Sequence, residues 1–168
     1  MGLQKKIQLL FIALLTVTFV NAQYKPASPA ASATGKINGA TITINYSSPS
    51  VKERVIWGQL VPFNKIWRAG ANAATTIESD KDLVVEGKKL PAGKYSFFVI
   101  PNQKECVIIF NKVAKLSGTT NYDEKEDQIR VTVKPEVANS STESLIYKIN
   151  KNSIVLSWEN WNIPITVK

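Results

Sequence analysis

Short runs of alternating apolar and polar residues recur along this chain, and they constrain its fold more than any other feature. In residues 40–47, for example, Ile42, Ile44 and Tyr46 alternate with threonine or asparagine. A period of two is typical of a half-buried strand, whereas no segment after residue 30 keeps the 3.6-residue period of a helix. The runs that we expect to form strands are 31–37, 40–47, 75–78, 83–86, 95–100, 107–110, 129–134, 145–149, 154–158 and 163–167.

Turn residues separate these runs and define the fold class. Asn38-Gly39 lies between two of them, and this dipeptide favours a type I′ hairpin because both central residues need a positive φ. About nine to ten short strands, separated by turns every 8–12 residues or so, are typical of sandwiches and barrels. The sequence therefore predicts an all-β protein, an antiparallel β-sandwich of the jelly-roll or Greek-key kind.

Two almost continuously apolar runs, 95–100 and 106–110, are expected to be central strands covered on both faces and paired with each other. Pro164 marks the last run as an edge strand, since proline donates no backbone hydrogen bond. Cys106 opens one apolar run and is expected to be a shielded, unreactive core residue. The residues expected in the core are Ile42, Ile44, Tyr95, Phe97, Val99, Ile108, Phe110, Ile129, Val131, Leu156 and Trp158.

The first 22 residues have the pattern of a secretory signal peptide. Lys5 and Lys6 precede an apolar run at 7–20, and the small residue Ala22 ends a cleavage pattern. We predict cleavage after Ala22, a leader at 23–30, a single sandwich domain at 31–168 and a periplasmic or secreted location. The apolar run is shorter than the roughly 20 residues that a membrane span requires. The cleaved protein is therefore not expected to span a membrane.

The composition excludes several kinds of catalytic group and metal site. The chain has no histidine and one cysteine, which removes the usual neutral-pH base and every histidine or multi-cysteine metal site. The formal net charge is +8, yet lysines are spread along the chain rather than clustered as in nucleic-acid binders. The acidic residues at 80–82 and 123–127 are expected to be solvated turn residues. We predict no catalytic residue, no metal site, no cofactor and no nucleic-acid partner.

The segment from Ser48 to Ala74 lacks alternation and is far longer than the roughly 4–6 residues of a typical loop. It holds two of the four tryptophans and two of the three arginines, and arginine's planar fork suits binding of carboxylate or phosphate. Two interpretations remain open. The segment either plugs one end of the sandwich or forms a binding site. The candidate ligand-binding residues are Trp67, Arg68, Asn72, Lys65, Thr75 and Trp57.

Five motifs, in this order, resemble a known family: 41–47 (TITINYS), 57–63 (WGQLVPF), 65–72 (KIWRAGAN), 90–96 (LPAGKYS) and 156–159 (LSWE). They are similar to domain-of-unknown-function family 2911, whose members are exported bacterial proteins. The likeness spans about residues 26–167, and it implies export and architecture rather than an activity. Members of that family usually carry glutamate where this chain has Ala73, so any role of that carboxylate would be lost here.

Three classes of function follow from these features. The first is non-enzymatic binding of a small molecule, a glycan or an envelope partner through the segment from Trp57 to Asn72. The second is an envelope hydrolase that uses carboxylates distant in sequence, which would lie about 5–9.5 Å apart in a cleft. The third is a structural or assembly accessory protein whose sheet edge pairs with a partner strand.

Overall fold

The computed structural model describes residues 27–168; the predicted signal peptide and residues 23–26 of the predicted leader lie outside the described residues. The described chain forms ten strands and one short 3-10 turn, η2 (Glu124–Glu126). The strands are β1 (Ala30–Ile37), β2 (Ala40–Ser47), β3 (Thr75–Ser79), β4 (Leu83–Val85), β5 (Lys88–Leu90), β6 (Gly93–Ile100), β7 (Cys106–Asn111), β8 (Asp127–Val133), β9 (Glu136–Ile149) and β10 (Ser153–Thr166).

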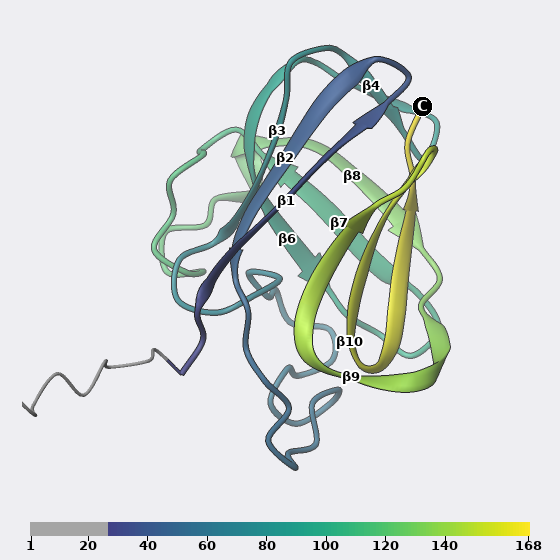
Figure 1. The fold of residues 1–168 in the computed structure, drawn as a ribbon. Coiled ribbons are helices and arrows are strands. Elements are labelled where there is room, and N and C mark those ends of the chain that lie inside the picture. Colours follow the sequence, from purple (N-terminus) through teal and green to yellow (C-terminus); the bar gives the residue numbers. More distant parts are fainter. Residues whose placement is uncertain (1–26) are drawn as a thin grey trace, which may run out of the picture.

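The first layer is a six-stranded antiparallel sheet in the order β1-β2-β3-β6-β7-β8 (Figure 1). Its first hairpin turns at Asn38 and Gly39, whose φ angles of 49° and 79° suit the predicted type I′ turn. Strands β6 and β7 pair with each other near the middle of the sheet, as predicted.

The second layer is the long β9–β10 ribbon, which packs against the sheet (Figure 1). Together the layers confirm the predicted all-β antiparallel sandwich. The prediction of two separate strands at 154–158 and 163–167 was wrong, because β10 continues through a bulge at Glu159, where φ is 51°. The prediction for 145–149 was too short, because β9 begins at Glu136 with a half that is mostly exposed and so lacks a buried stripe.

The core lies between the two layers and contains the predicted residues, with one exception. Ile129, near the start of the edge strand β8, is only partly buried, whereas Val131 and Val133 further along that strand are buried. A second, smaller cluster covers the opposite face of the central strands, where Phe98 and Ile109 pack with Leu116. The central strands are thus apolar on both faces, as their continuous apolar sequence predicted.

A small β4–β5 hairpin closes the end of the sandwich that holds the C-terminus. The amide of Val84 donates to the carbonyl of Lys168, and the amide of Lys168 donates back to Val84. Pro164 lies in β10, which forms a two-stranded sheet with β9 and is therefore an edge strand, as predicted. Within residues 27–168, no helix has the length and apolar character needed to cross a membrane.

Candidate functional site

Residues 48–74, here called the 48–74 loop, cross the other end of the sandwich between β2 and β3 (Figure 1). Near its start, the amide of Val51 donates to the carbonyl of Glu143 in β9. Near its end, Trp67 pairs with Val99 of β6 through backbone hydrogen bonds of 2.8 and 2.9 Å. The loop is therefore attached to both layers and spans the space between them.

The loop has features of both the plug and the binding site that its sequence suggested. Ile56, Trp57 and Val61 are buried and belong to the core cluster. Val55 and Leu60, however, are 52% and 45% exposed. One side of the loop therefore completes the core, while other apolar side chains remain at the surface.

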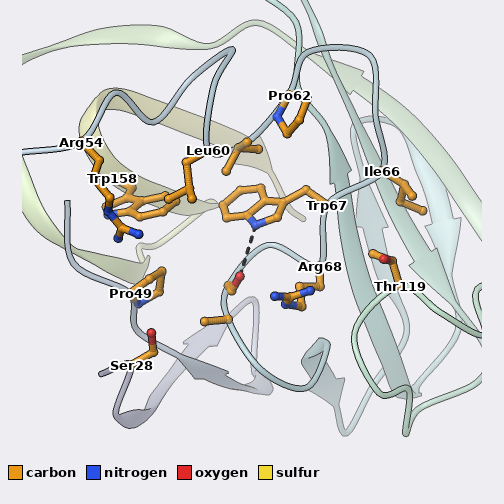
Figure 2. Close-up of a pocket in the computed structure, with 13 residues that line it drawn as sticks. Ser28, Pro49, Arg54, Leu60, Pro62, Ile66, Trp67, Arg68, Thr119 and Trp158 are labelled. Atoms are coloured by element: carbon orange, nitrogen blue, oxygen red, sulfur yellow. Dashed lines mark hydrogen bonds between the residues drawn. The ribbon is translucent and has the colours of Figure 1, made fainter. Parts of the chain in front are cut away.

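All four tryptophans, two from the loop and two from β10, form one aromatic cluster. The ring of Trp57 stacks on Trp161 at a centroid distance of 4.6 Å, and Trp67 stacks on Trp158 at 5.8 Å. Trp57 also meets Trp67 edge to face at 5.6 Å. The indole nitrogen of Trp67 donates to the carbonyl of Gly70 at 3.2 Å, which fixes the plane of that ring (Figure 2).

A cavity of about 360 Å³ opens beside this cluster. Figure 2 shows Trp67 between Arg54 and Trp158 on one side and Arg68 and Thr119 on the other. The lining residues come from the segment before β1, the 48–74 loop, the connection before η2, and β10. They are Ser28, Pro49, Arg54, Leu60, Val61, Pro62, Ile66, Trp67, Arg68, Gly70, Ala71, Thr119 and Trp158.

Arg68 is the most unusual of the lining residues. Its side chain is half-buried, and its Nε atom is enclosed without a hydrogen-bond partner among residues 27–168. Gly118 lies against the guanidinium: a Cβ atom placed there would come within 3.3 Å of Arg68 Nη1. Glycine thus allows the backbone to approach the guanidinium closely, and any larger residue would crowd it.

The other charged lining residue is also an arginine. Arg54 donates from Nε to the carbonyl of Val51 at 3.0 Å and from Nη2 to the carbonyl of Ser50 at 2.6 Å. These backbone carbonyls fix the guanidinium but do not neutralise its charge. The lining residues within 27–168 include these two arginines and no acidic residue, so this part of the lining is positively charged.

The backbone beside Arg68 is held in an uncommon conformation. Ala69 has a φ of 52°, in the left-handed region, and is fully buried. Its carbonyl accepts a hydrogen bond of 2.9 Å from Thr75 Oγ1 and one of 2.7 Å from Tyr147 Oη. Burial raises the pKa of Tyr147 well above its ordinary value, so this hydroxyl remains a donor even in alkaline solution. Two buried donors therefore hold the turn that places Arg68 at the cavity.

Two of the six predicted site residues, Trp67 and Arg68, line the cavity. Trp57 is buried in the aromatic cluster, and Thr75 is buried beneath the turn that it stabilises. Thr75 therefore supports the site from below and does not face the cavity.

The two remaining predicted residues lie outside the cavity lining. Asn72 is exposed and donates from Nδ2 to Ser47 Oγ at 3.2 Å, and Lys65 is exposed. Conversely, Arg54 and Trp158 line the cavity although the sequence did not single them out as ligand-binding residues. The rarity of arginine in this lysine-rich chain was the signal that could have identified Arg54.

Acidic side chains of the turns pair with neighbouring residues. Asp82 pairs with Lys89 at 2.9 Å, and that bond, together with the amide of Ala92, lowers the pKa of its carboxyl group. Among residues 27–168, no group of three histidine, cysteine or acidic residues could hold a metal ion.

The prediction that all these acidic residues are solvated was wrong for Asp127, whose side chain is only 7% exposed. Its Oδ2 accepts hydrogen bonds from Arg130 Nε at 2.6 Å and from Tyr122 Oη at 2.7 Å, while its Oδ1 accepts one from Asn111 Nδ2 at 2.8 Å. These bonds compensate for the burial of the carboxylate, and they anchor the connection before β8.

Comparison with known proteins identifies the family. Residues 28–167 match the family described as protein of unknown function (DUF2911), and the chain belongs to that family. This agrees with the resemblance carried by the five sequence motifs. No curated protein and no solved structure matches the chain. Because the family description states no activity, a functional hypothesis has to come from the site.

Proposed function

We propose that this protein binds a small molecule in the cavity beneath the 48–74 loop and does so without catalysing a reaction. The observation that carries the proposal is the cavity itself, in which a half-buried tryptophan and a half-buried arginine lie next to each other. Small-molecule sites are typically apolar clefts of about 300–1,000 Å³ with a few well-placed polar groups. A cavity of about 360 Å³ is at the lower end of that range.

The lining supports binding rather than acid–base or nucleophilic chemistry. The half-buried Trp67 presents aromatic surface, while Arg54, Arg68 and Thr119 present hydrogen-bond donors. The lining residues within 27–168 include no carboxylate and no thiol, and the sequence has no histidine. General acid–base catalysis usually requires one of these groups within hydrogen-bond reach of the substrate.

Export is part of the proposal and rests on the sequence of the first 22 residues. We propose that cleavage after Ala22 produces a protein that begins at Gln23 and works in the periplasm or outside the cell. Mass measurement of the N-terminal peptide, on protein taken from the cell envelope, tests this directly. A protein that retains Met1, or that stays in the cytosol, would contradict it.

The binding proposal is tested by thermal shift with a panel of sugars, amino acids, nucleotides and organic acids. A ligand that binds the folded state raises the melting temperature by mass action. We expect Ala71→Phe, which fills the cavity, to abolish the shift produced by a true ligand. Ala92→Phe adds the same side chain at an exposed turn residue outside the lining and should leave the shift intact.

Two results would contradict the proposal. One is a panel in which every stabilising compound acts equally on both phenylalanine variants, which would place binding outside the cavity. The other is a panel with no compound whose effect depends on Ala71.

A further inference from the structure

Arg68 lacks the partner that a half-buried guanidinium normally has. Residues 27–168 contain no ion pair and no side-chain hydrogen bond that involves Arg68, and its Nε is enclosed. A donor removed from water without a partner destabilises a fold, and the penalty is larger when the donor is charged. Arg130, which is also partly buried, has Asp127, Glu124 and Tyr122 as partners. Of these two arginines, Arg68 is therefore the one suited to a partner from outside the protein.

The surroundings of Arg68 indicate the charge of that partner. The second charged group of the lining, Arg54, is fixed by backbone carbonyls and adds a second positive charge. Figure 2 shows the two arginines on opposite sides of the cavity, with the Trp67 ring between them. An uncharged ligand would leave the two positive charges without a counter-charge, whereas an anion would supply one. A guanidinium forms paired hydrogen bonds with planar carboxylates and with phosphates.

The tryptophans indicate the shape of the uncharged part of the ligand. The Trp67 ring is held by its bond to Gly70 and by stacking on Trp158, so it presents a fixed aromatic surface. Flat rings pack well on such surfaces. Because the cavity has a volume of only about 360 Å³, it suits a single ring bearing one acidic group rather than a polymer.

Building on the proposed function, we infer that the ligand is a small organic anion: a single flat ring that packs on Trp67 and carries a carboxylate or phosphate group bound by Arg68. Gly118 contributes by leaving room for the guanidinium, which a Cβ would otherwise approach to 3.3 Å. Arg54 adds attraction from the opposite side. Both a carboxylate and a phosphate can form paired hydrogen bonds with the Arg68 guanidinium, and the test below distinguishes the two groups.

The probes are benzoate, phenyl phosphate, benzyl alcohol and inorganic phosphate. Binding is followed by the fluorescence of the tryptophan cluster, which contains all four tryptophans of the chain. We expect benzoate or phenyl phosphate to bind at least about tenfold more tightly than benzyl alcohol, which lacks the charge, because a charge-assisted pair contributes that much or more. Inorganic phosphate, which lacks the ring, should be weaker by a similar factor. Tighter binding of benzoate would indicate that the ligand carries a carboxylate, and tighter binding of phenyl phosphate would indicate that it carries a phosphate.

Variants connect the binding to Arg68. Arg68→Lys keeps the charge but loses the fork, and we expect at least a tenfold loss of affinity with the protein still folded by thermal melt. Arg68→Gln should abolish binding of the anion. The matched control is Lys65→Gln, which removes a positive charge from the same loop but outside the lining, and it should change the affinity less than twofold at moderate salt.

The outcomes separate this inference from the proposed function. If an uncharged compound binds in a way that Ala71→Phe abolishes and Arg68→Gln does not, the anion inference is wrong and small-molecule binding stands. If inorganic phosphate binds as tightly as phenyl phosphate, the ring component of the inference is wrong. If benzoate or phenyl phosphate binds equally to wild type, Arg68→Gln and Ala71→Phe, both hypotheses fail for this cavity.

Discussion

The buried carbonyl of Ala69 allows a quantitative test of how the turn at Arg68 is maintained. That carbonyl receives one hydrogen bond from Thr75 Oγ1 and one from Tyr147 Oη, at 2.9 and 2.7 Å. Tyr147→Phe removes one donor and Thr75→Val removes the other, with little change in shape. After either single substitution the carbonyl keeps one partner, so each should destabilise the protein by about 1 kcal/mol, the net contribution of one hydrogen bond.

The double variant should cost more than the sum of the single variants. It leaves a fully buried carbonyl with neither side-chain donor, and the desolvation penalty for such a group is about 1–3 kcal/mol. The expected total is therefore about 3–5 kcal/mol, of which about 1–3 kcal/mol is coupling between Thr75 and Tyr147. That total is a substantial fraction of the roughly 5–15 kcal/mol that stabilises a typical domain.

The assay is urea denaturation of wild type, both single variants and the double variant, followed by tryptophan fluorescence. The free energies of unfolding form a double-mutant cycle, and the coupling is the deviation from additivity. Thr75→Ser serves as a control, because it removes a methyl group but keeps the donor, so its coupling to Tyr147→Phe should be small. Additivity within about 0.5 kcal/mol would refute the idea that these two hydroxyls jointly satisfy one carbonyl.

Three further predictions concern other parts of the fold. Burial, reinforced by the bond to Asp127, raises the pKa of Tyr122 to about 12, so the stability it contributes is complete below pH 10 and is lost as the pH rises from 10 through 12. Tyr122→Phe should lose less unfolding free energy than wild type between about pH 10 and pH 12, and an equal loss would contradict this assignment. Cys106 is buried, and desolvation raises its pKa, so a polar thiol reagent should label it only after denaturation; rapid labelling of native protein would exclude this burial. Gly35→Ala should lower the free energy of unfolding, measured by urea titration, by about 1–3 kcal/mol, because the new Cβ would lie 2.7 Å from Ile149 Cγ2. A decrease below about 0.5 kcal/mol would mean that the two layers separate easily there.

The features predicted correctly from the sequence are those that local patterns determine. The turn at Asn38-Gly39 needs a backbone conformation that this dipeptide adopts easily, so its position was visible in the sequence. The first half of β9 was not, because its residues are mostly exposed and no buried stripe marks them as a strand. The alternation rule detects strands that bury one face, and this half of β9 does not.

The site was predictable in its location but not in its composition. The length of the segment and its arginines drew attention to the 48–74 loop, and two of the six predicted residues line the cavity. Trp158 was expected in the core and is 1% exposed, yet it also lines the cavity from β10. The positive φ of Ala69 had no sequence signal, since alanine seldom adopts it and the donors that hold it lie elsewhere in the chain.

The order of the two layers along the chain has a consequence for synthesis. The six-stranded sheet is built from residues 30–133, whereas the ribbon that covers its apolar face comes from residues 136–166. Until the ribbon has emerged, Ile42, Ile44 and Phe97 of the sheet have no second layer to pack against. Most of the stabilising burial therefore becomes available only after nearly the whole chain has been made. We therefore expect the sandwich to complete its fold only after β9 and β10 have been translated.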